Sequence, residues 1–196
     1  MSMSATLAAW RVAALIPLAL IAALLPARAM AQPLQPVHVN IWETVQFERK
    51  LSQGRDCLHS EYAGASVAST TCMVVGAQQN WLFRNTGIDK TYEIYNPRTN
   101  GCLDVEGASR SRGALVLDWP CHGGINQKWR VLARAQYERS HVVLQSAHSG
   151  LCIESENGAL RMRDCYAEQG GVPVFSMLWP GEREARQSPN GSPIQV

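Results

Sequence analysis

Six cysteines are the residues of this chain whose number and spacing bear most directly on chemistry. They follow one another in pairs whose members are 15, 19 and 13 residues apart: Cys57, Cys72, Cys102, Cys121, Cys152 and Cys165. Zinc sites use closely spaced thiolates, and no Cys-x-x-Cys occurs in the sequence. The even number of cysteines therefore predicts disulfides and no metal site, although six cysteines alone allow 15 connectivities.

Motifs of the common enzyme classes do not occur. There is no Gly-x-Ser-x-Gly, no His-Glu-x-x-His and no glycine-rich phosphate loop. The nearest approach, Gly64-Ala65-Ser66-Val67-Ala68, lacks its second glycine. We therefore expect a protein that is not an enzyme and that needs no cofactor.

The first 31 residues have the pattern of an export signal. Residues 12–25 form an unbroken apolar run, and small residues at Ala29 and Ala31 form the Ala-x-Ala signature of signal peptidase cleavage. The alternative, a transmembrane anchor, needs about 20 apolar residues, whereas this run is shorter and has Pro17 in its middle. We expect the mature chain to begin at Gln32, to have no membrane span and to be secreted or periplasmic, where disulfides persist.

The charge of the mature chain excludes two classes of partner. Two of the 18 Lys and Arg residues, Arg11 and Arg28, lie in the expected signal, which leaves 16 bases against 16 acids. A neutral chain has no basic excess with which to bind phosphates or anionic membranes. We expect no nucleic-acid partner.

Three segments of the chain resemble one another. The first cysteines of the pairs lie 45 and 50 residues apart, and each unit ends near a tryptophan, namely Trp81, Trp129 and Trp179. Short alternating runs between turn-forming clusters predict strands, and no segment has a convincing helical period. The two cysteines of each unit flank a hairpin-like stretch, which predicts the disulfides Cys57–Cys72, Cys102–Cys121 and Cys152–Cys165.

The sequence therefore predicts an all-β fold of three repeats of about 45–50 residues with one disulfide in each. We expect a signal peptide at 1–31, a short N-terminal tail at 32–39, the repeat domain at 40–181 and a flexible C-terminal tail at 182–196.

The pattern Gly-Cys-Leu-Asp, Trp-x-Cys and Asn-Gln-x-Trp resembles the ricin B-chain-type lectin family, whose fold is the β-trefoil. It is most complete in the second repeat, from Gly101 to Trp129. The resemblance implies that Trp81, Trp129 and Trp179 are core residues. It also implies that Gln79 and Gln127 hold a loop to the backbone.

The family resemblance implies a sugar site in the second repeat, made of Asp104, Trp119, Asn126 and Gln127. The carboxylate would accept hydrogen bonds from two neighbouring sugar hydroxyls, the indole would stack on a galactose-like ring, and the amides would supply further hydrogen bonds. The side chains of Asp104 and Trp119, like those of His59 and Arg163, are expected on the surface around the site. Leu117 replaces a polar residue that is frequent in the family.

The first and third repeats depart from this pattern. The carboxylate position holds His59 in the first and Glu154 in the third, and the aromatic position holds Thr70 and Arg163. The resemblance therefore implies a secreted, galactose-type lectin with one working site, whose partners are glycans.

An alternative reading is a host-surface-binding delivery subunit. The chain is similar in size and plan to the lectin-like subunits of cytolethal distending toxins, which act with a partner subunit. In that reading residues 32–43 would form a partner-binding tail.

Overall fold

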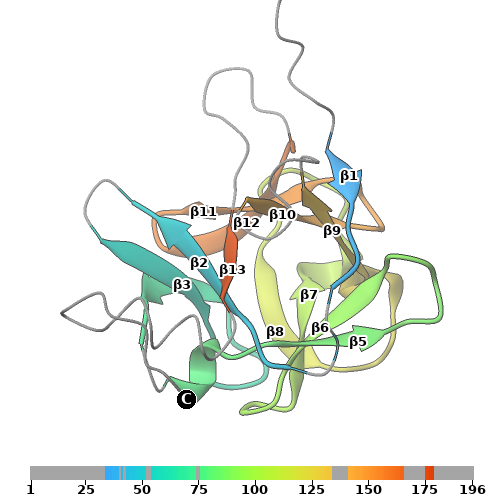
Figure 1. Ribbon diagram of the computed structural model, residues 1–196. Coiled ribbons are helices and arrows are strands. Elements are labelled where there is room, and N and C mark those ends of the chain that lie inside the picture. The colour runs from blue at the N-terminus through green and yellow to red at the C-terminus, as the bar shows by residue number, and fades with distance from the viewer. Residues whose placement is uncertain are drawn as a thin grey trace, which may run out of the picture. The chain divides into compact units, whose positions relative to one another are not determined.

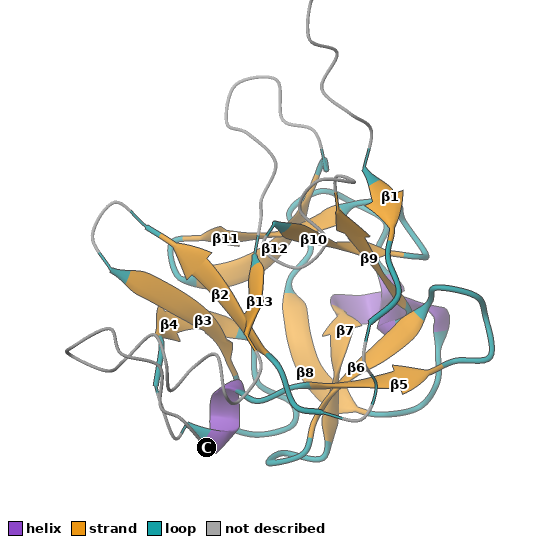
Figure 2. Cartoon of the chain, viewed as in Figure 1, coloured by secondary structure: helices purple, strands orange, loops and turns teal. Residues whose placement is uncertain are grey.

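The computed structural model describes residues 34–39, 41, 43–51, 54–73, 76–133, 141–165 and 175–178. Strands and short 3-10 turns make up the regular structure in these ranges (Figure 2). No helix among them is long and apolar enough to span a membrane. The expected signal peptide, the tail at 182–196 and Trp179 lie outside the described residues.

Each repeat contributes four strands. The first repeat contains β2 (Gln46–Lys50), β3 (Arg55–His59), β4 (Ala68–Thr71) and β5 (Leu82–Asn85). The second contains β6 (Tyr92–Asn96), β7 (Gly101–Val105), β8 (Val116–Pro120) and β9 (Trp129–Ala133). The third contains β10 (Val142–Ser146), β11 (Cys152–Glu156), β12 (Ala159–Arg163) and β13 (Ser176–Leu178).

The outer strands of the repeats close a ring. The last strand of each repeat pairs with the first strand of the next, as β5–β6, β9–β10 and β13–β2. Within each repeat the first strand also meets the last, through the pairs Val45–Trp81, Tyr92–Trp129 and Val142–Phe175. The six strands therefore form a closed barrel with no free edge between repeats.

The inner strands of the repeats form three hairpins, β3–β4, β7–β8 and β11–β12 (Figure 2). Adjacent hairpins touch one another through the pairs Ala68–Ala159, Ser66–Leu117 and Leu115–Arg161. A six-stranded barrel capped by a triplet of hairpins is a β-trefoil, so the predicted fold class is confirmed.

One set of three large aromatic side chains from equivalent positions lies in the core. Trp81 and Trp129 are fully buried, and their indole N–H groups donate to the carbonyls of Leu58 and Leu103 at 3.1 and 2.8 Å. The strand register gives the third position of this set to Phe175, which is 1 % exposed and faces Val142 as Trp129 faces Tyr92. The core position that the spacing assigned to Trp179 is therefore occupied by a residue four places earlier.

All three predicted disulfides are present, each within one repeat: Cys57–Cys72, Cys102–Cys121 and Cys152–Cys165. Each joins the first strand of a hairpin to the segment just after the second strand. The cysteine pairing inferred from the repeats is confirmed.

Removing the first disulfide should destabilise the protein measurably. In the chain-entropy model a bond that closes a loop of 15 residues is worth about 3 kcal/mol. The double substitution Cys57→Ala and Cys72→Ala should lower the free energy of unfolding by about that amount, as measured by denaturant unfolding without reductant. An unchanged midpoint would contradict the assigned pairing.

The segment before the first repeat also joins the sheet. Strand β1 (Gln35–Pro36) pairs with β9 (Figure 1). Val37 and Val39 pack against the core at half-buried positions. The Val37 amide donates to the carbonyl of Val131 at 2.9 Å. Part of the stretch expected as an N-terminal tail is thus an additional strand on the second repeat.

Candidate functional site

A hollow of about 470 Å³ lies on the second repeat, where the sequence predicts a sugar site. Strands β7 and β8 supply Asp104 and Trp119, and the turn η4 (Ile125–Gln127) supplies Asn126. The turn η3 (Glu106–Ala108), Leu117 and His122 complete the lining. Three of the four predicted sugar-binding residues therefore line one cavity.

The β7–β8 hairpin sets the spacing of the site. Cys102 lies opposite Trp119 and Asp104 lies opposite Leu117, so the acid and the indole come from neighbouring positions of one ladder. The hairpin packs closely because Gly101 has no Cβ. A Cβ there would lie 1.6 Å from Oδ1 of the buried Asp118, whose other oxygen accepts the Thr99 hydroxyl at 2.6 Å. The glycine of the Gly-Cys-Leu-Asp pattern thus allows the two strands to meet.

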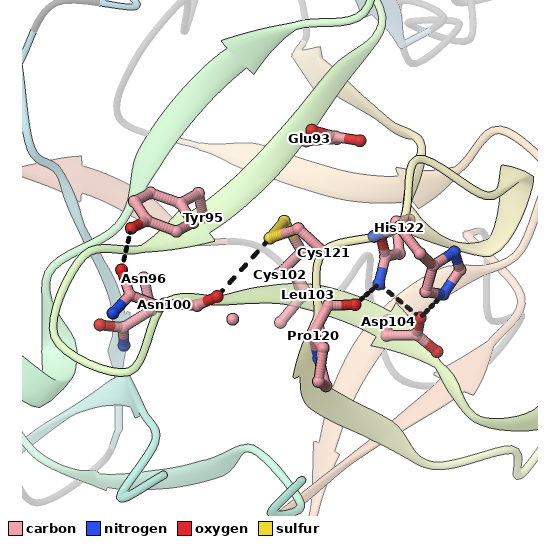
Figure 3. The surroundings of a disulfide bond; sticks show 12 residues. Glu93, Tyr95, Asn96, Asn100, Cys102, Leu103, Asp104, Pro120, Cys121 and His122 are labelled. Carbon is pink, nitrogen blue, oxygen red and sulfur yellow. Dashed lines mark hydrogen bonds and ion pairs between the residues drawn. A yellow bond between two sulfur atoms is a disulfide. The ribbon is translucent and has the colours of Figure 1, made fainter. Parts of the chain in front are cut away.

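Asp104 lies at the base of the hollow. The sequence had predicted it on the surface. Every residue of β7 is buried, and Asp104 is 3 % exposed. Its Oδ2 accepts a hydrogen bond from Gln127 Nε2 at 2.9 Å. It accepts a second one from His122 Nε2 at 3.2 Å (Figure 3). Asn126 Nδ2 lies 2.9 Å from both carboxylate oxygens.

Burial dominates the electrostatics of this acid. Desolvation raises the pKa of Asp104 above its ordinary value, against the hydrogen bond from Gln127, the nearby His122 and the hydrogen bond from Asn126. An ionised carboxylate at this position is held in a fixed orientation by three donors. It is therefore a preorganised acceptor at the base of an open cavity.

Trp119 forms an exposed aromatic wall of the same hollow. It is 44 % exposed, which is unusual for so large a ring, whereas Trp81 and Trp129 are fully buried. A Cβ at Gly64, in the loop between β3 and β4, would lie 4.0 Å from its ring edge. The indole therefore rests against the first repeat and keeps much of its surface in water.

Gln127 supports the site from behind. It is fully buried, its Oε1 accepts the amides of His122 and Gly123 at 2.9 and 3.2 Å, and its Nε2 donates to Pro120 O at 3.0 Å. Gln79 makes the matching bonds in the first repeat, to the Met73 amide and Thr71 O. Of the predicted sugar-binding residues, Gln127 alone does not line the hollow and instead positions the loop and the acid.

His122 is a residue of the site that the sequence reasoning did not single out. Its Nδ1 accepts the amide of Gly124 at 3.0 Å while its Nε2 contacts Asp104. The signal available in the sequence is weak, since it consists of a histidine between the Trp-x-Cys stretch and the glycines Gly123 and Gly124. Its contact with the acid depends on the loop that Gln127 holds.

In the other two repeats, the positions equivalent to Asp104 and Trp119 hold residues of other types. The strand pairs Cys57–Thr70 and Cys152–Arg163 match Cys102–Trp119, so neither repeat has an aromatic ring at that position. Arg163 forms an ion pair with Glu156. His59, at the carboxylate position of the first repeat, contacts Glu61 Oε1 at 2.7 Å.

Two other features bear on ligands. Within the ranges that the structure describes, no group of three or more His, Cys, Asp and Glu side chains could hold a metal ion. A second hollow of about 310 Å³ lies at the turn between β5 and β6, against His38, Asn85, Lys90 and Tyr92.

Comparison with known proteins agrees with the fold. Residues 77–161 match the family model described as ricin-type beta-trefoil lectin domain-like. A search of the curated proteins finds no match.

Several solved structures share the fold. A designed threefold symmetric protein, ThreeFoil, is 25 % identical at a TM-score of 0.57, over 68 % of this chain and 97 % of that one. The lectin of Polyporus squamosus, solved with the epitope Neu5Aca2-6Galb1-4GlcNAc, is 15 % identical at 0.58, over 69 % of this chain and 48 % of that one. This chain thus spans about half the length of that lectin.

A third solved structure, the Haemophilus ducreyi cytolethal distending toxin, is 13 % identical at a TM-score of 0.53, over 74 % of this chain and 88 % of the matched one. At such identities the last two likenesses show the fold alone. The family match over residues 77–161 and the threefold pairing of strands together show that this chain contains a β-trefoil similar to the ricin-type lectin domain.

Proposed function

We propose that this protein is an exported, non-catalytic lectin that binds a galactose-type sugar in the hollow of its second repeat. One observation carries the proposal: an oriented carboxylate, Asp104, and an exposed indole, Trp119, line the same cavity. Burying an acid costs free energy, which hydrogen bonds offset only in part, and perturbed acids in open cavities are typical of functional sites.

The carboxylate and the indole suit a sugar ring because one matches its hydroxyls and the other its apolar C–H face. The ionised carboxylate accepts hydrogen bonds from hydroxyls, and such charge-assisted bonds are stronger than neutral ones. The indole offers an apolar face to the C–H groups of the ring. A single open site of this kind should bind with a dissociation constant near ~1 mM, about −4 kcal/mol, so avidity from clustered copies would be needed for firm attachment.

An NMR titration with methyl β-D-galactopyranoside tests the proposal. The indole N–H of Trp119, the side-chain amide of Asn126 and the ring of His122 should shift with one common dissociation constant. Signals of His59 and Arg163 should stay in place, because their repeats lack the pair of groups. Saturable shifts centred on the third repeat, or none at all, would contradict a site in the second repeat.

The affinity should fall in acid. Only the ionised carboxylate of Asp104 accepts two hydrogen bonds from hydroxyls without also donating, and its pKa is raised by burial. As the pH falls through that raised pKa the acid gains a proton, and the sugar loses its acceptor at a pH above that of an ordinary carboxyl. Titrations from neutral pH into the acid range should show this loss, and an affinity that is constant down to pH 3.8, the ordinary pKa of an aspartate, would refute it.

Export is part of the proposal. The three disulfides are of the kind that persists outside the reducing cytosol. The intact mass of the exported protein should correspond to a chain that begins at Gln32. A mass that includes residues 12–25 would argue for an anchored protein.

A second candidate is a delivery subunit of a cytolethal distending-type toxin complex. The specific observation in its favour is that the likeness to the Haemophilus ducreyi toxin spans 88 % of the matched chain. Such a subunit would bind a host surface and a nuclease partner. A nuclease reading frame beside this gene would favour it, whereas a solitary gene would favour the free lectin.

A further inference from the structure

The carboxylate of Asp104 has little free acceptor capacity in the structure. A carboxylate offers about four lone-pair sites, two on each oxygen. Oδ2 lies within hydrogen-bond distance of Gln127, Asn126 and His122, at 2.9, 2.9 and 3.2 Å. Among the residues that the structure describes, Oδ1 has one hydrogen-bond partner, Asn126 at 2.9 Å. The acid can therefore accept one sugar hydroxyl at Oδ1, whereas two neighbouring hydroxyls would need Oδ2 as well.

His122 is the donor that can leave Oδ2. Gln127 is fully buried and also bonded to Pro120 O, and Asn126 Nδ2 is shared between both oxygens. The side chain of His122 is 45 % exposed and makes the longest of the three bonds. A hydroxyl that reaches Oδ2 can replace its N–H and leave the ring in water.

The backbone favours the position in which the His122 imidazole is hydrogen-bonded to Asp104. The Gly124 amide donates to Nδ1 at 3.0 Å, so the neutral imidazole carries its proton on Nε2 and donates it to Asp104. Gly124 has no Cβ, and one would lie 2.5 Å from Cε1 and 2.7 Å from Nδ1 of His122. The glycine therefore leaves room for the ring in its position over the acid.

We propose that His122 is a specificity-determining residue of the sugar site: it covers Oδ2 of Asp104 and yields only to a ligand with two neighbouring hydroxyls. This inference rests on the proposed function, because it concerns the same cavity. A ligand with one suitable hydroxyl binds at Oδ1 and does not disturb the histidine. A ligand with two exchanges the His122 bond for its own.

Titration of the parent and of His122→Ala with methyl β-D-galactopyranoside and its 3-deoxy and 4-deoxy analogues tests this. Without the competing donor the complete sugar should bind about three- to tenfold more tightly, the equivalent of one net hydrogen bond. The analogue that lacks the hydroxyl for Oδ2 should show no gain. In the free parent, the imidazole nitrogen shifts should report the Nε2–H tautomer, and this signal should move when the complete sugar is added.

Gly124→Ala is a second way to expose Oδ2 of Asp104, because the added Cβ must displace the His122 ring. That Cβ would also lie 2.8 Å from Asn126 Oδ1, so the same substitution in the His122→Ala background serves as its control.

The outcomes separate the two proposals. Tighter binding by His122→Ala that depends on one hydroxyl supports the inference, and so does binding by His122→Ala when the parent binds nothing. Equal or weaker binding by His122→Ala, with the parent binding normally, overturns the role of His122 and leaves the lectin site standing. If neither protein binds any of the three sugars, the galactose-type site itself is refuted, and the inference falls with it.

Discussion

Replacing Trp129 with alanine should lower the free energy of unfolding by about 3–5 kcal/mol, the range for removal of a large buried aromatic side chain. The indole is fully buried in the trefoil core, so its removal leaves a cavity that the barrel strands cannot readily fill. It also leaves the carbonyl of Leu103, which now accepts the indole N–H at 2.8 Å, without that partner.

A thermal melt measures this loss. For a domain of this size 1 kcal/mol corresponds to a shift of roughly 2–4 °C, so the midpoint should fall by at least about 6 °C. Trp119→Ala is the matched control, because it removes the same side chain from a half-exposed position. A midpoint for Trp129→Ala as high as that of Trp119→Ala would contradict the assignment of Trp129 to the core.

Replacing Asp104 with alanine should abolish detectable sugar binding and also destabilise the fold. The substitution removes the acceptor of the sugar hydroxyls. It also leaves the amide groups of Gln127 and Asn126 without their shared partner, and a buried donor left unpaired costs about 1–3 kcal/mol. The loss of binding should therefore come with a lower melting temperature.

Asp104→Asn separates the two effects. It keeps the size of the side chain and one acceptor oxygen, but it removes the charge whose burial is unfavourable. We expect it to melt closer to the parent than Asp104→Ala and still to bind sugar at least tenfold more weakly. Sugar binding by Asp104→Asn at the parent affinity would show that the acid is not the acceptor.

Much of the fold could be predicted because the repeat encodes it. The cysteine spacing set the register of the hairpins, and the strand pairs of Thr70, Trp119 and Arg163 with the first cysteines follow that register. The third core aromatic could not be found in this way. Its repeat carries no Gln-x-Trp, and the residue two before Phe175 is Pro173, which has no side-chain amide.

The sequence predicted most residues of the site, but not the burial of Asp104 or its contact with His122. Sequence spacing places Asp104 and Trp119 on one hairpin, but it does not tell which face of β7 is covered. The burial of Asp104 comes from packing on both sides of that strand. The contact with His122 comes from loop geometry, in which Gln127 binds two successive amides and Gly124 leaves space for the ring.

The most direct test of a single sugar site in the second repeat is a pair of calorimetric or NMR titrations with a galactoside. Trp119→Ala and Arg163→Ala alter equivalent positions of the second and third repeats, on β8 and β12. Both side chains are accessible to solvent, so both variants should fold. Trp119→Ala should lose binding altogether, because the stacking face is gone, and Arg163→Ala should bind as the parent does. Parent-like affinity in Trp119→Ala, or loss of binding in Arg163→Ala, would contradict the assignment of the site.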